Sequence, residues 1–283
     1  MAQPVSLPLP QLRKLGETTR QDRWWVQPVL VLTGLLAFIV YSTWAALQGE
    51  HFVYLENGAN YLSPFYSPVL FDPPGFRSGH AWFGEVPGWL LAIWPTFIVP
   101  FTPALLILWA PGGFRFTCYY YRGAYYKAFW ADPLNCSVGE PQFRKQNYRG
   151  ERWLPLVLQN VHRYFLYIAI LFLFILSWDA ILAYIFTGDD GGKEFGIGVG
   201  SLVLTGNPIF LGAYTLGCHS LRHLIGGRKD ALGDGAQRTA YDCVSCLNRR
   251  HMMWAWISLF WVGFSDVYVR LCAMGIWSDW RII

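Results

Sequence analysis

Cysteine and histidine side chains are concentrated in one short part of this chain. The 283 residues include only six Cys and six His. Five of these twelve lie within positions 218–246, namely Cys218, His219, His223, Cys243 and Cys246, and His251 follows closely. Imidazole nitrogen and thiolate sulfur are the usual protein ligands of zinc and of some iron–sulfur clusters. This grouping predicts a metal centre.

The spacing within the group suits one shared site. His219 and His223 are four residues apart, so on a helix they project from the same face. Cys243 and Cys246 form a CxxC pair, whose thiolates can bind a single ion. Two His and two Cys make a tetrahedral zinc set, and equally the ligand set of a Rieske-type [2Fe-2S] cluster. Spacing alone does not choose between these metals, and Cys218 or His251 could replace one of the four ligands.

Long apolar segments must position this group. The chain is 54% hydrophobic and 14% charged, whereas soluble domains carry roughly 25% charged residues. A helix needs about 20 apolar residues to cross the hydrocarbon core of a bilayer. Five segments meet that requirement, so we expect an all-α integral membrane protein, with residues 1–283 in one bundle of five transmembrane helices. The expected spans are 26–47, 87–110, 165–186, 195–217 and 252–277.

The loops between these spans indicate how the chain is oriented. Residues 1–25 lack the features of a cleaved signal peptide, so we expect them to be retained. Four Lys or Arg precede the first span, seven lie in 111–153 and six in 218–250, but only Arg77 lies in 48–86. Cytoplasmic loops carry the excess of Lys and Arg. This distribution predicts a cytoplasmic amino terminus, an external carboxyl terminus and a metal centre at the cytoplasmic side. Basic residues confined to a few loops do not indicate a nucleic-acid partner.

Three charged residues fall inside the expected spans. Asp266 and Arg270 are four residues apart in the fifth span, and Asp179 lies in the third. An intramembrane charge costs at least about 2.5–3.5 kcal/mol on insertion scales, which makes it a candidate for a functional role. A self-neutralising structural pair and a role in proton movement or quinone binding are both consistent with this pattern.

Four further polar residues are candidates for contact with a quinone at the cytoplasmic side. His162 and Arg163 begin the third span, where an imidazole could bind a quinone carbonyl and a guanidinium could balance negative charge. Arg222 and Tyr241 lie nearest the Cys and His group in sequence. Interfacial packing is the simpler explanation for the residues at 162 and 163.

Two stretches resemble a known family. NPIFLGAYTLGCHSLRHLIGG and WAWISLFWVGFSDVYVRLCAMGIWSDWRII are similar to the SdhC-type membrane anchor of actinobacterial succinate dehydrogenase, in particular the mycobacterial type 1 enzyme with a Rieske-type cluster in its membrane part. The resemblance implies a haem-free anchor in the bacterial plasma membrane that passes electrons to menaquinone and does not itself oxidise succinate. It implies cluster ligands at His219, His223, Cys243 and Cys246.

The resemblance also implies partners. These are a flavoprotein subunit with FAD, an iron–sulfur subunit with further clusters and a small membrane-anchor subunit; a higher oligomer of the complex is left open. Two other classes of protein compete with this interpretation. One is a transporter or scaffold with a structural zinc site, and the other is a b-type cytochrome that uses His162 with His219 or His223.

Overall fold

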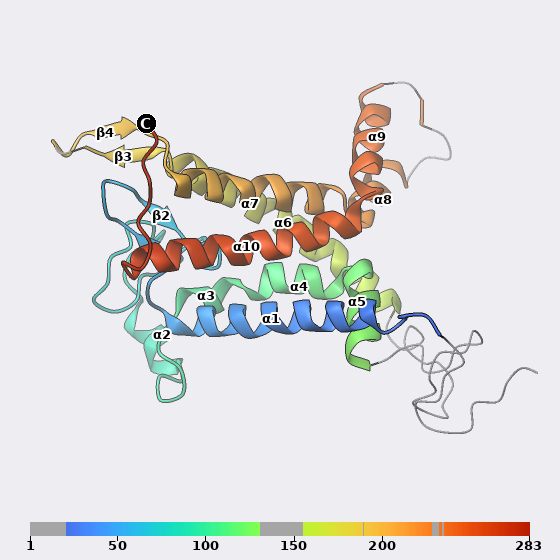
Figure 1. Ribbon diagram of the computed structural model, residues 1–283, viewed down its shortest axis with the longest axis horizontal. Coiled ribbons are helices and arrows are strands. Elements are labelled where there is room, and N and C mark those ends of the chain that lie inside the picture. Colours follow the sequence, from blue (N-terminus) through green and yellow to red (C-terminus); the bar gives the residue numbers. More distant parts are fainter. Residues whose placement is uncertain (1–20, 131–154, 189, 228–231, 234) are drawn as a thin grey trace, which may run out of the picture. The chain divides into compact units, whose positions relative to one another are not determined.

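The computed structural model describes residues 21–130, 155–188, 190–227, 232–233 and 235–283. In this part of the chain, four helices are long and apolar enough to cross a membrane. They are α1 (Val26–Gln48), α6 (Pro155–Leu182), α7 (Val199–Leu216) and α10 (His251–Ala273), drawn in Figure 1. Several basic residues used to orient the chain lie outside the described residues: Arg13, Lys14, Arg20, Arg144, Lys145, Arg149, Arg152, Arg228 and Lys229.

Four of the five expected spans correspond to these helices, with shifted bounds around one hairpin. The strand β3 (Ile185–Thr187) pairs antiparallel with β4 (Lys193–Phe195). The hairpin occupies residues that the apolar pattern had assigned to helix. As a result α6 ends at Leu182 rather than 186, and α7 begins at Val199 rather than 195.

The segment 87–110 is not the continuous helix that its hydropathy predicts. It contains the short helices α2 (Gly88–Ile93) and α3 (Pro103–Ile107) and the start of α4 (Trp109–Thr117). Pro95, Pro100 and Pro103 explain the break, because proline lacks the N–H that a helix interior needs and drives the preceding residue out of the helical region. A count of five membrane crossings therefore stays a prediction.

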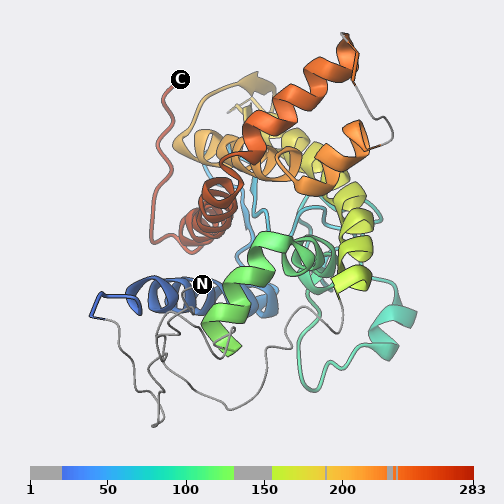
Figure 2. The same cartoon turned by 90° about the vertical axis from the view of Figure 1, so that its right-hand side faces the viewer.

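The chain divides into two compact units. The first consists of the residues up to Ala37 together with Thr117–Asn160, and its described part includes α5 (Tyr119–Trp130). The second consists of Phe38–Phe116 and Val161–Ile283. In the second unit α7 and α10 pack side by side, as do the short helices α8 (His219–Gly226) and α9 (Ala236–Asn248) (Figures 1 and 2).

A folded segment covers one end of the helices in the second unit. The strands β1 (Val53–Tyr54) and β2 (Tyr61–Leu62) pair antiparallel and are buried. Beside them the rings of Phe52 and Tyr66 stack with centroids 4.3 Å apart. The Tyr66 hydroxyl donates to the carbonyl of Ala45 near the end of α1. This segment is thus a packed part of the core rather than a simple surface loop.

The close packing of α7 on α10 makes a testable prediction. A Cβ added at Gly206 would lie 2.1 Å from Nε1 of Trp261, an atom that already donates to the carbonyl of Val203 at 3.0 Å. Gly206→Ala should therefore destabilise the protein by about 1–3 kcal/mol, the usual cost of overpacking. Thermal unfolding of the purified complex in detergent measures the effect.

Gly212→Ala is the matched control, since its Cβ would meet Leu173 at an ordinary 3.6 Å in the same helix. This variant should keep or slightly raise the melting temperature, because alanine is the better helix former. Equal melting temperatures for the two variants would contradict the packing described between α7 and α10.

Candidate metal centre and its surroundings

The two predicted histidine ligands lie in α8 and line a polar cavity. His219 and His223 are one helical turn apart, and they share a cavity of about 500 Å³ with Arg222 and Tyr241. The guanidinium carbon of Arg222 lies 5.1 Å from the centre of the Tyr241 ring. Burial lowers the pKa of His219, and the neighbouring His223 and Arg222 act in the same direction. The cavity is therefore basic in character.

Three of the four predicted quinone-contact residues gather at this cavity. Arg222 and Tyr241 line it, and Nη2 of Arg163 lies 3.4 Å from Nδ1 of His223. The fourth candidate, His162, follows a different course. Adjacent residues on a helix point in different directions, and the imidazole of His162 is buried elsewhere.

The predicted cysteine ligands lie on the other face of α9. Val244 is buried, Asn248 donates to the carbonyl of Gly217 at 2.8 Å, and the Tyr241 ring fills the space beside Gly226. Residues three or four apart share a helix face, so these contacts define the packed face. Cys243 and Cys246 fall outside it and are exposed.

The described part of the chain therefore does not bring the four predicted ligands around one ion. Among the residues that the structure describes, no three His, Cys, Asp or Glu side chains are grouped so that they could hold a metal. The two histidines remain neighbours, whereas the CxxC pair points away from them.

One imidazole and one thiol do meet in the second unit. Nε2 of His162 in α6 lies 3.1 Å from Sγ of Cys218, the residue that precedes α8. Both side chains are buried, with 5% and 1% of their surface exposed. Nitrogen and sulfur donors of this kind bind zinc or iron. The pair was not found from the sequence because the two residues are 56 positions apart; Cys218 was only an alternate ligand and His162 only a quinone contact.

Aromatic rings enclose this pair. The ring of Phe114 stacks on His162 with centroids 4.8 Å apart and planes 6° from parallel. Phe114 also meets Tyr214 edge to face at 5.4 Å, and His251 stacks on Tyr214 at 5.0 Å. The alternate ligand His251 is thus linked to the pair through two rings.

The intramembrane charges form satisfied networks. Nε of Arg270 lies 3.2 Å from Oδ2 of Asp266, and both side chains are almost fully buried. Tyr41 donates to the same carboxylate oxygen at 2.5 Å, and Ser63 donates to Oδ1. Arg270 also donates to the carbonyl of Glu50 at 2.9 Å. The pair therefore fastens the segment after α1 to α10.

Asp179 in α6 serves the same segment, because it accepts a hydrogen bond from Ser67. Two carboxylates on two different helices thus hold Ser63 and Ser67, which flank the buried Tyr66. These contacts favour the structural interpretation of the charged residues over a role in proton movement.

Comparison with known proteins identifies the family. The family model of the actinobacterial succinate dehydrogenase subunit SdhC matches residues 26–275. The chain belongs to this family. It is also similar to a solved chain of the Mycobacterium smegmatis Sdh1 complex in the apo form, with 41% identity over 97% of each chain and a TM-score of 0.78. No curated protein matches the chain.

Membership of the SdhC family confirms the membrane-anchor prediction. The chain is a subunit of an oxidoreductase complex, and the other subunits of that complex are its partners. Its four long apolar helices agree with a place in the membrane.

Proposed function

We propose that this SdhC chain passes electrons from an iron–sulfur partner subunit to menaquinone in the bilayer, by way of a Rieske-type [2Fe-2S] cluster. In this proposal the chain crosses the plasma membrane five times, with its amino terminus in the cytoplasm and its carboxyl terminus outside. A flavoprotein subunit with FAD oxidises succinate, and a small membrane-anchor subunit completes the complex. Family membership and the excess of basic residues in alternate loops support the proposal.

The observation that carries the redox proposal is the buried contact between His162 and Cys218. A Rieske-type cluster binds two imidazoles and two thiolates, and the imidazoles raise its reduction potential. The pair supplies one donor of each kind. We propose that His162 and Cys218 are cluster ligands and that His251 is the second imidazole. The set His219, His223, Cys243 and Cys246 remains the competing assignment, and Cys218→Ser separates the two.

The neighbouring side chains fit the surroundings that such a centre requires. Phe114 covers one face of the His162 ring, and the ring of Tyr214 lies against both Phe114 and His251. Apolar rings around metal ligands exclude water and fix ligand orientation, which are two of the means by which a protein tunes a potential. When bound, the cluster would accept and release one electron at a time.

Metal content and spectra of the purified complex test this function against its rivals. The proposal expects iron in excess of that held by the soluble subunits, no zinc and no Soret absorption band. Zinc in place of that iron would support the structural-zinc scaffold, and a Soret band would support the b-type cytochrome. Succinate oxidation should reduce a menaquinone analogue as well as a water-soluble phenazine; reduction of the phenazine alone would overturn electron transfer to quinone.

A further inference from the structure

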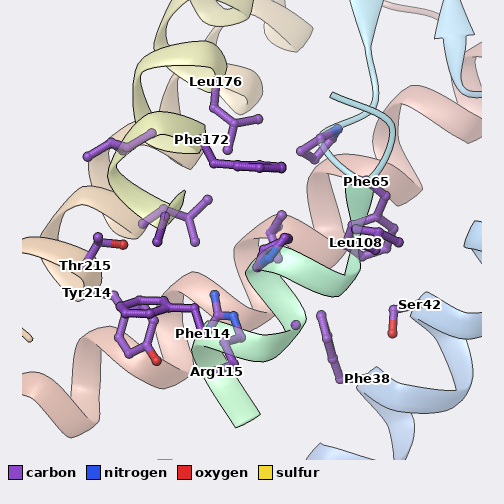
Figure 3. Close-up of a pocket in the computed structure, with 17 residues that line it drawn as sticks. Phe38, Ser42, Phe65, Leu108, Phe114, Arg115, Phe172, Leu176, Tyr214 and Thr215 are labelled. Carbon is purple, nitrogen blue, oxygen red and sulfur yellow. The ribbon is translucent and has the colours of Figure 1, made fainter. Parts of the chain in front are cut away.

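A second, apolar cavity lies within the second unit. It has a volume of about 190 Å³ and is lined by residues of α1, α4, α6, α7 and α10. Figure 3 shows Phe172 and Leu176 facing the space from α6, opposite Phe114 and Arg115 of α4. An apolar cavity of about 150 Å³ takes up a benzene ring, whereas drug-sized ligands need roughly 300–1,000 Å³. The cavity therefore suits a flat ring system rather than a whole large ligand.

One part of the cavity wall is polar. The guanidinium of Arg115 lines the space, with Nη2 at 3.1 Å from Oγ of Ser258 and Nη1 at 3.3 Å from the carbonyl of Ala255. Its central carbon lies 4.8 Å from the centre of the Tyr214 ring. The Thr215 side chain is on the same side (Figure 3). A few placed polar groups in an otherwise apolar pocket are the usual means of orienting a ligand.

Two contacts connect this cavity to the buried imidazole and thiol. Phe114 lines the cavity and stacks on His162. Thr215 also lines it, and its carbonyl accepts a hydrogen bond from the backbone N–H of Cys218 at 3.2 Å. One aromatic ring therefore separates the cavity from His162, and a single turn of backbone separates it from Cys218.

We infer that this cavity binds the ring headgroup of an isoprenoid quinone, with a quinone carbonyl directed to Arg115 and the isoprenoid tail outside the cavity. The inference rests on the proposed electron transfer and gives it a location. None of the four residues predicted from sequence to contact quinone lines this space. A lipid acyl chain would suit the apolar wall but has no group to accept a hydrogen bond from a guanidinium, so the quinone ring is the better fit.

Gly112 permits a direct test, because it lines the cavity and a Cβ added there would meet no heavy atom within 4 Å. In the whole complex, Gly112→Leu should fill the space without disturbing the backbone. The KM for a short-chain menaquinone analogue should rise about 10–100-fold, the scale of loss expected when a reactant is displaced. Succinate oxidation with the phenazine acceptor should keep its wild-type rate, which also shows that the complex has assembled.

Gly123→Leu is the matched control. Gly123 lies in α5, a Cβ there is equally unobstructed, and it does not line the cavity. Its KM for the analogue should equal that of the wild type. Leu176→Phe fills the same cavity from α6 and serves if Gly112→Leu fails to assemble. An unchanged KM in the cavity-filling variants would overturn the assignment.

Photolabelling keeps this inference separate from the proposed function. An azido-naphthoquinone should label peptides of α4 or α6 in the wild-type complex and should fail to label the Gly112→Leu variant. Labelling of this kind would support the cavity even if the complex reduced phenazine but not quinone, a result that sinks electron transfer alone. A co-purifying phospholipid that is lost from Gly112→Leu, without any quinone labelling, would show that an acyl chain fills the space and would overturn the inference.

Discussion

Replacing Asp266 with Ala is expected to destabilise the chain by about 3–5 kcal/mol, the usual cost of leaving a buried charge without its partner. Arg270 is only 2% exposed and would lose both carboxylate contacts. Tyr41 and Ser63 would lose their acceptor as well. Unfolding of the purified complex by heat or denaturant in detergent measures the loss, and the segment that follows α1 should become sensitive to proteases first.

The chain contains its own control for this effect. Arg238 and Asp242 form the same i, i+4 pair in α9, with Nε and Oδ2 3.0 Å apart, but both side chains are exposed. Asp242→Ala should cost no more than about 0.5 kcal/mol. Replacing both Asp266 and Arg270 with apolar residues should recover much of the stability, since the unpaired charge is then absent. Equal effects of Asp266→Ala and Asp242→Ala would contradict a structural clamp.

The second large effect concerns the assignment of cluster ligands. Cys218→Ser should remove the paramagnetic signal of the reduced membrane cluster, because a hydroxyl does not replace a thiolate on iron. The amount of bound membrane-cluster iron should fall at least about tenfold, since changing even an outer-shell partner of a metal ligand costs roughly 10–100-fold in affinity. Electron paramagnetic resonance and iron analysis of the whole complex provide the two measurements.

Cys243→Ser and Cys246→Ser are the matched variants, as both thiols are exposed on α9. Each should keep the signal at its wild-type intensity, with FAD content and melting temperature unchanged. The reverse pattern, with the signal lost from the CxxC variants and kept in Cys218→Ser, would favour the ligand set expected from sequence spacing. Cys118→Ser and His251→Gln extend the series to another buried cysteine and the remaining histidine candidate.

Hydropathy predicted most of the helical framework, because a run of apolar residues long enough to span a bilayer is a local property of the chain. The helices α1, α7 and α10 lie close to their expected bounds. The segment 87–110 is as apolar as the others but contains Pro95, Pro100 and Pro103. An average over a window counts these prolines only by their hydropathy, whereas the backbone needs their missing N–H groups.

The candidate site was harder to predict for a related reason. CxxC and the His pair at i, i+4 are local patterns, and the direction of a helix face then decides whether they converge. The packing of Tyr241, Val244 and Asn248 fixes that direction for α9. The contact between His162 and Cys218, and a cavity lined by five helices, arise from tertiary structure and leave no pattern in the sequence.

The central claim is that this SdhC chain holds an iron centre bound by imidazole as well as thiolate. Hyperfine spectroscopy of the succinate-reduced wild-type complex tests it most directly, because directly bound imidazole couples nitrogen to the unpaired electron. The account predicts nitrogen couplings from two imidazoles on a two-iron cluster, and one set should disappear in His162→Gln. A complex in which every reduced cluster lacks imidazole nitrogen coupling would contradict the account.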